Sequence, residues 1–248
     1  MSYTKFVIIS SPRTGSTSLS SILNCNPKII CYQELFDDSE GNELLDDDKR
    51  QNLKYSVEKA TRIRNENPEL FLQDVLYRSY SKTVKAVGFK FHYDHADTFP
   101  MVLDYLQKDR SIKVLHLKRH NILDSYISLL KALKTRQWIN VQGQEDIISG
   151  NIRFVIDYHA CRDYFIKIEN YWYKFDQIFK DHKVLNLEYE AITSRKKDAI
   201  LQEFLTAPIR NIESPLIKHP FTKHSFTIKN YQELKEKFQN TKWIDFFE

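Results

Sequence analysis

The residues best suited to chemistry stand in one short loop near the start of the chain. Residues 10–17 read SSPRTGST and lie between an apolar run and a helical pattern. A loop that joins a buried strand to a helix directs backbone N–H groups and the helix N-terminus at one point, which favours phosphate or sulfate. Gly15 lets the backbone approach a ligand closely, and the guanidinium group of Arg13 can donate two hydrogen bonds to the oxygens of an anion. Ser16 and Thr17 can donate hydroxyl hydrogen bonds or cap the helix. The loop therefore predicts an anion site.

The nucleotide P-loop, G-x-x-x-x-G-K-[ST], is the obvious comparison for this loop, which departs from it at two positions. Ser10 stands where the first glycine belongs, and Ser16 stands where the lysine belongs. The lysine that reaches the β- and γ-phosphates is thus missing, which weighs against a kinase. An ordinary serine-rich turn before a capped helix is the structural alternative.

A second candidate anion site follows another apolar run, residues 112–118. Arg119 comes directly after this run, and Ser125 lies in the first turn of the helical pattern behind it. Ligands of open α/β sheets bind at the carboxyl ends of strands, which is where Arg119 is expected. A surface arginine beside an exposed serine is the alternative. Taken together, the two sites predict a ligand with two separate anionic groups.

The elements that must position these residues alternate along the chain. Alternating strands and helices predict an α/β fold of three layers, with a parallel sheet flanked by helices on both faces. The expected strands are residues 6–10, 29–32, 84–91, 112–118 and 183–187. The expected helices are residues 16–23, 49–64, 68–80, 96–107, 122–133 and 151–179.

Length and composition limit the classes of protein that remain. With 248 residues, 42% hydrophobic residues and a net charge of +4, we expect one domain over residues 1–248, without affinity for nucleic acid. No apolar run reaches the ~20 residues of a transmembrane helix, and no signal peptide is evident, so we expect a cytoplasmic protein. The three cysteines have no paired spacing and are read as free thiols.

Two further segments bear on binding. Residues 134–150 are polar and long for a connection, which favours a lid or substrate loop, with a disordered insertion as the alternative. Trp138 in this segment could stack on an acceptor, or it could simply pack against the protein. The basic residues 218–225 could close over phosphates or form a solvated segment. The aromatic residues of the helix at 151–179 suggest a core helix, and an exposed face would suit a homodimer.

At both anion motifs the chain resembles the sulfotransferases that use 3′-phosphoadenosine 5′-phosphosulfate (PAPS). Residues 11–17 look like their 5′-phosphosulfate loop, and Arg119 with Ser125 looks like their 3′-phosphate clamp. A looser resemblance extends to residues 32–36, 184–190 and 230–234. The resemblance implies a P-loop NTPase-like fold, PAPS as donor, 3′-phosphoadenosine 5′-phosphate (PAP) as product, and no metal. The cofactor-binding residues that it implies are Ser11, Pro12, Arg13, Thr14, Gly15, Ser16, Thr17, Arg119 and Ser125.

The sequence departs at two places from the cytosolic sulfotransferases that act on phenols and steroids, which indicates a different branch of the family. Arg13 stands in for their loop lysine, and no glycine follows Gly150, so their glycine-rich C-terminal loop cannot be present in that form. The pattern is closer to the Golgi-type and bacterial carbohydrate or glycolipid sulfotransferases. The acceptor that this implies is a hydroxyl of a carbohydrate or glycoconjugate.

The resemblance also suggests which residues act in catalysis. Arg13 would stabilise the charge that grows on the leaving 5′-phosphate. Glu34 matches the general base of the bacterial carbohydrate enzymes, whereas His92, in Lys90-Phe91-His92, matches the base of the phenol-type enzymes. Both remain candidates, as do two other functions: a P-loop-like nucleoside or sugar kinase, and a non-catalytic nucleotide-binding module of the same fold.

Overall fold

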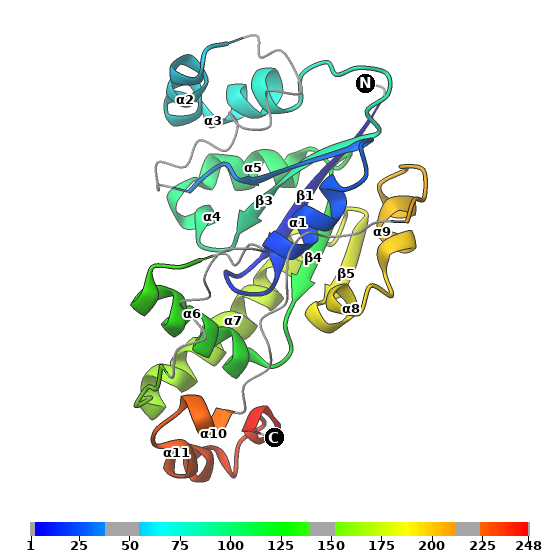
Figure 1. The fold of residues 1–248 in the computed structure, drawn as a ribbon. Coiled ribbons are helices and arrows are strands. Elements are labelled where there is room, and N and C mark those ends of the chain that lie inside the picture. The colour runs from blue at the N-terminus through cyan, green and yellow to red at the C-terminus, as the bar shows by residue number, and fades with distance from the viewer. Residues whose placement is uncertain (1–2, 38–54, 139–151, 212–223, 248) are drawn as a thin grey trace.

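A five-stranded, all-parallel sheet forms the centre of the protein (Figure 1). The computed structural model describes residues 3–37, 55–138, 152–211 and 224–247. The strand order is β2-β3-β1-β4-β5, so β1 lies in the middle and its carboxyl end is flanked by those of β3 and β4. The strands are β1 Thr4–Ser10, β2 Ile29–Glu34, β3 Ala86–His92, β4 Lys113–Lys118 and β5 Val184–Glu188. All five expected strands are confirmed.

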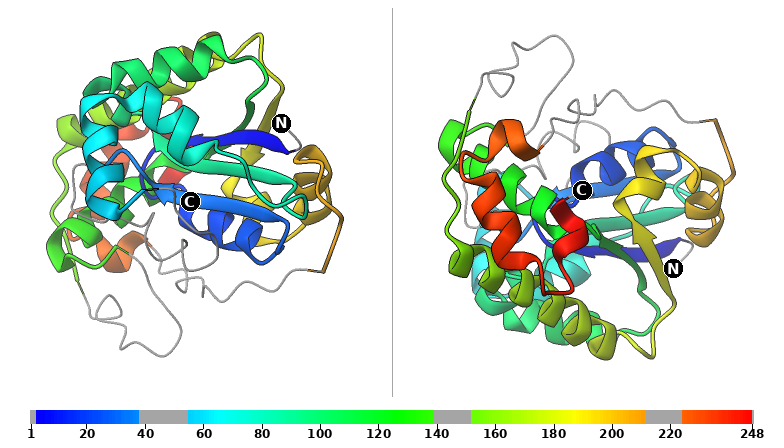
Figure 2. Two further views of the ribbon diagram at one scale, coloured as in Figure 1. Left: turned by 90° about the horizontal axis from the view of Figure 1, so that it is seen from above. Right: turned by 90° about the horizontal axis from the view of Figure 1, so that it is seen from below.

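Apolar side chains on both faces of the central strands explain why helices cover the sheet on both sides (Figure 2). Phe6 and Ile8 of β1 pack with helices α1, α8 and α9, whereas Val7 and Ile9 point to the opposite face and pack under η2, α5 and α7. The predicted three-layer α/β architecture is confirmed. On the first face the helices are α1 Ser16–Asn24, α8 Tyr189–Thr193 and α9 Asp198–Phe204. On the second face lie the π-helical turn η2 Phe71–Leu76, α5 Pro100–Lys108 and α7 Tyr158–Ile178.

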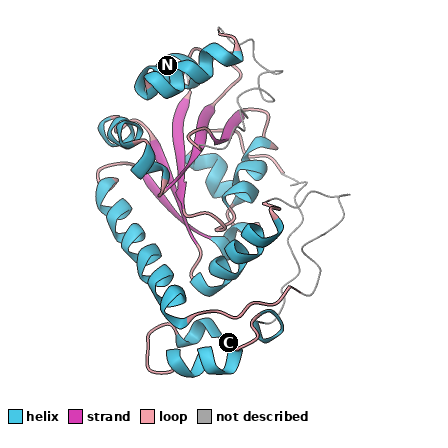
Figure 3. Ribbon diagram, turned by 90° about the vertical axis from the view of Figure 1, so that its left-hand side faces the viewer, coloured by secondary structure: helices cyan, strands magenta, loops and turns pink. Residues whose placement is uncertain are grey.

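The remaining helices lie around this frame, and the last of them pack at one end of the molecule beside α7 (Figures 1 and 3). A third apolar cluster joins α6 and α7 to the C-terminal residues, with Phe165 and Phe238 fully buried in it. The C-terminal segment is therefore anchored to the frame. These helices are α2 Val57–Glu66, α3 Pro68–Leu70, α4 His95–Thr98, α6 Ile122–Thr135, α10 His224–Thr227, α11 Tyr231–Phe238 and the 3₁₀ turn η4 Ile244–Phe247.

Four expected helices differ clearly from the structure. The helix predicted over residues 49–64 is α2 Val57–Glu66, because Ser56 caps it by accepting a hydrogen bond from Lys59 N; residues 49–54 lie outside the described residues. The helix predicted over residues 96–107 is two helices, because Phe99 precedes Pro100 and a residue before proline avoids helical backbone angles. The helix predicted over residues 68–80 ends at Leu76 in the π-helical turn. The long helix begins at Tyr158, because Asp157 caps it by accepting a hydrogen bond from Ala160 N.

Candidate active site

The loop after β1 has the backbone shape of an anion site. Arg13 and Gly15 have left-handed backbone angles, with φ of 65° and 86°, and the hydroxyl of Thr14 donates to the carbonyl of Ser11 at 2.7 Å. Gly15 is the N-cap of α1, and no side chain caps the helix. The first N–H groups of α1 therefore have no intrahelical acceptor and face the loop, as anion binding requires. In the described part of the chain, the buried hydroxyls of Ser10 and Ser11 also have no hydrogen-bond partner.

Tyr189, the first residue of α8, lies between this loop and the second anion motif. A Cβ atom added to Gly15 would lie 2.6 Å from Tyr189 Cδ2, so the aromatic ring rests directly on the glycine. The guanidinium carbon of Arg119 lies 4.3 Å from the centre of the same ring. One side chain thus links the two motifs, which places both at the carboxyl ends of β1 and β4.

Arg119 is held by a carboxylate but retains an unused donor. Its Nη2 atom donates to Asp124 Oδ2 at 2.7 Å, and the other oxygen of Asp124 accepts from His224 Nε2 at 2.7 Å. Burial would raise the pKa of Asp124, but the hydrogen bond from His224 and the charge of Arg119 lower it. Among the described residues, the buried Arg119 Nε and Ser125 Oγ atoms have no partner. Two donors are therefore available at the predicted clamp.

Among the described residues, Arg13 is held by neutral acceptors only. Its Nε atom donates to Ser128 Oγ at 3.0 Å, and its Nη1 atom donates to the carbonyl of Trp138 at 2.5 Å. No carboxylate of the described residues forms an ion pair with it. Burial, and then the positive charge of Arg119, lower the pKa of Arg13. The two guanidinium groups are thus close enough to repel each other, and an anion between them would relieve that repulsion.

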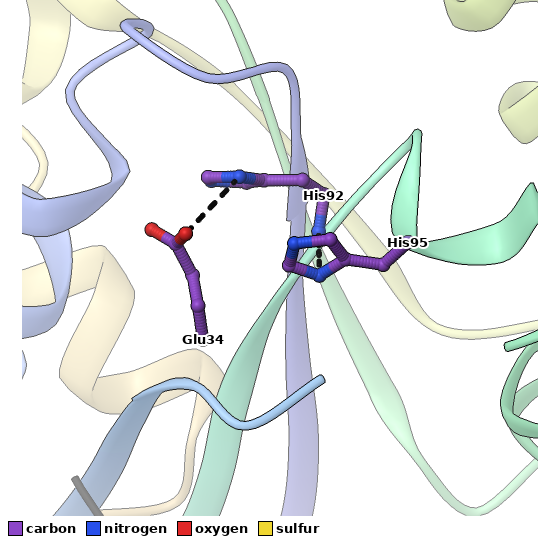
Figure 4. A group of neighbouring side chains, drawn as sticks. All are labelled: Glu34, His92 and His95. Atoms are coloured by element: carbon purple, nitrogen blue, oxygen red, sulfur yellow. Dashed lines mark hydrogen bonds and ion pairs between the residues drawn. The ribbon is translucent and has the colours of Figure 1, made fainter. Parts of the chain in front are cut away.

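A carboxylate, an ammonium and an imidazole meet at the ends of β2 and β3. Lys90 Nζ lies 2.9 Å from Glu34 Oε1 and also donates to the Thr17 hydroxyl at 3.0 Å. His92 Nδ1 lies 3.7 Å from Glu34 Oε2 (Figure 4), and its Nε2 lies 3.2 Å from Ser16 Oγ. The cluster therefore touches the first two residues of α1, next to the anion loop.

Burial and charge set the protonation of this cluster. Burial would raise the pKa of Glu34, but the adjacent positive charges of a protonated His92 and of Lys90 lower it to about 2. Burial lowers the pKa of His92 to about 3. The imidazole is consequently neutral at neutral pH, and Lys90 is then the cation that keeps the Glu34 carboxylate ionised.

Comparison with known proteins decides the family. The model of the sulfotransferase family matches residues 6–202, most of the chain, including both anion motifs. The chain belongs to the sulfotransferase family. It is 27% identical to nodulation protein H of Rhizobium tropici, over 98% of this chain and 92% of that protein. Identity to nodulation protein H of Rhizobium meliloti (strain 1021) is 25%, over 98% of this chain and 94% of that protein.

The fold is also that of a solved sulfotransferase. A sulfotransferase from Alicyclobacillus acidocaldarius superposes with a TM-score of 0.51 at 10% sequence identity, over 95% of this chain and 91% of that one. The fold class expected from the sequence, a parallel sheet of the sulfotransferase type, is confirmed. Among the described residues, no helix combines the length and the apolar character needed to cross a membrane.

The structure brings most of the predicted site residues of this sulfotransferase together. The loop residues contact two other elements: Arg13 reaches Ser128 of α6, whereas Ser16 and Thr17 reach His92 and Lys90 of β3. Glu34 and His92, which the sequence presents as rival bases, are neighbours in one cluster. Pro12 lies in the loop between Ser11 and Arg13. Most of the predicted lid at 134–150 and most of the basic segment at 218–225 lie outside the described residues.

Sequence reasoning assigned no role to several residues that the structure places at the site. Tyr189 and His224 fell only within a loosely similar segment and a basic segment, and in the structure Tyr189 packs on Arg119 while His224 reaches it through Asp124. Ser128 carries a usable signal, because it lies one helical turn after Ser125 and therefore on the same face of α6. Gln33 accepts from Lys90 Nζ at 2.8 Å and from Ser20 at 3.1 Å, which orients the lysine.

The residues near Glu34 could also be read as a metal site. Glu34, His92 and His95 offer ligand atoms that all lie within 4.8 Å of one another. However, the ammonium of Lys90 lies 2.9 Å from Glu34, and the backbone N–H of His92 donates to His95 Nδ1 at 3.2 Å. A cation here would sit beside a fixed positive charge and displace a backbone hydrogen bond. The chemistry of the cluster suits proton transfer better than metal binding.

Proposed function

We propose that this sulfotransferase transfers the sulfuryl group of PAPS to a hydroxyl of a carbohydrate or glycoconjugate. One observation carries the proposal: two partly buried guanidinium groups, Arg13 and Arg119, are joined through Tyr189 and Gly15, and an ionised carboxylate lies beside them. Such an arrangement fits a ligand with a phosphosulfate at one end and a phosphate at the other. It also offers a proton acceptor next to the phosphosulfate.

In the proposed complex, each anionic group meets a different set of donors. The 5′-phosphosulfate lies against the loop N–H groups and the residues Ser11, Pro12, Arg13, Thr14, Gly15, Ser16 and Thr17. The 3′-phosphate takes the unused Nε of Arg119 and the hydroxyl of Ser125, which have no partner among the described residues. Ser128 lies on the same face of α6 as Ser125 and accepts a hydrogen bond from Arg13, so α6 contributes to both sets of donors.

The transfer itself is an in-line displacement at sulfur. The acceptor oxygen forms a bond to sulfur while the bond from sulfur to the bridging phosphate oxygen breaks, and its electron pair stays on that oxygen. PAP leaves, and the acceptor proton passes to the protein. Arg13 and the N–H groups of the loop stabilise the charge on the leaving phosphate.

Glu34 is the proposed proton acceptor, with His92 as its partner. The Glu34 carboxylate, with a pKa of about 2, is a weak base as long as the ammonium of Lys90 remains paired with it. A sulfonate oxygen next to Thr17 would offer Lys90 a second anion, and a shift of the ammonium toward it would raise the pKa of Glu34. The neutral His92 ring lies between Ser16 and Glu34, 3.7 Å from the carboxylate, where it can receive or relay the proton.

The choice of a carbohydrate acceptor has one structural support besides the resemblance. Trp138 is 50% exposed, and its ring lies 6.0 Å from the guanidinium carbon of Arg13. An exposed aromatic face beside the reacting group is suited to stacking on a sugar ring.

Calorimetry with PAP tests the donor. We expect the wild-type protein to bind PAP more tightly than ADP, and Arg119→Ala to lose at least tenfold in PAP affinity, since a charge-assisted pair contributes about 1.5–3 kcal/mol. Arg162→Ala, at a surface arginine of α7, is the matched control and should bind like wild type. Equal affinity for PAP in wild type and Arg119→Ala would refute the clamp.

A turnover assay tests the base and the acceptor class. PAP release is measured with PAPS and a panel of oligosaccharide, glycolipid and phenolic acceptors. We expect Glu34→Gln to reduce kcat by about 10²–10⁴ while PAP affinity stays within a few-fold, because the base acts only in the transition state. Transfer to phenols alone would contradict the proposed acceptor.

A further inference from the structure

The proposal concerns how the Arg119 guanidinium is held in place. An arginine side chain has many rotamers, and a clamp works only if one of them is selected before the ligand arrives. One face of the guanidinium lies on Tyr189, with 4.3 Å between the guanidinium carbon and the ring centre, and its Nη2 atom donates to Asp124 Oδ2 at 2.7 Å. The orientation of Arg119 therefore depends on the orientation of Asp124.

Asp124 is itself fixed at three points. Its backbone N–H donates to Asn121 Oδ1 at 3.1 Å, Arg119 takes one carboxylate oxygen, and His224 Nε2 takes the other at 2.7 Å. Without His224, the carboxylate would have a free oxygen next to the site of a phosphate and could rotate about its χ angles. A free carboxylate at that place would repel the ligand and release the arginine.

His224 comes from a remote part of the chain that is held firmly in place. It lies 100 residues after Asp124, and its side chain is only 5% exposed. Its carbonyl accepts from Ile228 N at 2.8 Å, and Ile228 pairs with Phe154 in an isolated parallel bridge. The bridge and the buried Ile228 thus anchor α10 against the segment before α7. His224 also lies beyond residues 6–202, the part of the chain that the family model matches.

We propose that His224 is a positioning residue for the anion clamp, acting through Asp124 to hold Arg119 in the orientation that receives the 3′-phosphate. This proposal rests on the proposed function, because it takes PAP as the ligand. His224 makes no contact with the ligand in this scheme. The C-terminal segment would thereby stabilise the cofactor site through one hydrogen bond to a carboxylate rather than through a glycine-rich loop.

Two nucleotides that differ only in the 3′-phosphate test the proposal. The Kd values of PAP and of adenosine 5′-phosphate are measured by calorimetry for wild type, His224→Leu and His224→Gln. Leucine and glutamine have similar volumes, but only glutamine can donate an N–H to Asp124. We expect His224→Leu to weaken PAP binding about tenfold and to leave adenosine 5′-phosphate unchanged, because only the first ligand uses Arg119. His224→Gln should remain within about threefold of wild type.

Two further variants complete the design. His159→Leu replaces an exposed histidine of α7 and should leave both Kd values unchanged. In the double variant with Arg119→Ala, His224→Leu should weaken PAP binding less than it does in wild type, since residues that act through one another are not additive.

Each outcome bears on one of the two proposals. Equal losses for both nucleotides in His224→Leu would mean that the histidine only supports the fold, and the positioning role would be wrong. Unchanged PAP binding in His224→Leu, with tight PAP binding by wild type, would overturn the positioning role alone. No PAP binding by wild type would overturn the proposed donor and the positioning role with it.

Discussion

Replacement of Gly15 by alanine is the most direct test of how the anion loop is built. Gly15 has a φ of 86°, and an added Cβ atom would lie 2.6 Å from Tyr189 Cδ2 and 2.8 Å from Cε2. The variant therefore meets two separate penalties, backbone strain and a steric clash with an aromatic ring. The ring cannot simply move away, because Arg119 packs on it.

The expected size of the effect follows from these two terms. Holding an alanine in the left-handed region costs about 1 kcal/mol. Forcing a methyl group against a packed ring costs about 1–3 kcal/mol. The restriction of the unfolded chain by alanine offsets about 0.5 kcal/mol. We therefore expect Gly15→Ala to lower the free energy of unfolding by about 1.5–3.5 kcal/mol.

A double-mutant cycle separates the two penalties. The free energy of unfolding is measured in urea for wild type, Gly15→Ala, Tyr189→Ala and the double variant. Once the ring is absent, Gly15→Ala should cost only the strain less the effect on the unfolded chain, about 0.5 kcal/mol, so the coupling between the two sites should equal the clash of about 1–3 kcal/mol. A Gly15→Ala protein within 0.5 kcal/mol of wild type, or a coupling of zero, would refute the contact between Tyr189 and the loop.

Two further predictions concern charge in the Glu34 cluster. Lys90→Met removes the cation that lies 2.9 Å from Glu34, so the pKa of Glu34 should rise from about 2 toward its ordinary value. The titration is followed by ¹³C NMR of the Glu34 side-chain carboxyl. An unchanged pKa would show that Lys90 does not hold the carboxylate ionised. The free energy of unfolding should fall on acidification for two reasons. The unfolded chain binds a proton at His92 below about pH 6.5, whereas the folded chain binds it only near pH 3. The stability contributed by ionised Glu34 is lost as the pH falls from about 4.5 through about 2. Urea unfolding from pH 7 to pH 4 measures this, and His92→Asn should flatten the slope above pH 4.5; an equal slope in both proteins would assign the acid sensitivity to other groups.

The anion loop and the strands could be read from the sequence because their signals are local. A run such as Phe6 to Ile9, apolar at every position, has few alternatives to a strand buried on both faces. The anion-binding character of the loop that follows can be recognised from a glycine and the start of a helix, which lie within a few residues of each other. The same reasoning was wrong at Phe99 and at residues 152–157. A proline interrupts the helical pattern at the first place, and a capping aspartate begins the helix later at the second.

The partners of the site residues could not be read in this way. Glu34 and His92 come from strands 58 residues apart along the chain and meet because β2 and β3 are neighbours in the sheet. Tyr189 reaches Gly15 from the end of β5, two strands away from β1 in the sheet order. No spacing in the sequence specifies which strand ends will be neighbours.

The type of ligand site was therefore encoded locally, in residue types and short-range order, whereas its protonation and its rigidity arise only from packing. A side chain such as Glu34 has a fixed chemistry in any sequence, but its pKa depends on burial and on the charges that the fold brings within a few ångströms. Arg119 is recognisable as an anion ligand from its place after a strand. Its orientation depends on Asp124, Tyr189 and His224, the last two of them remote in sequence, because a guanidinium is directed by the groups it touches and not by its neighbours along the chain.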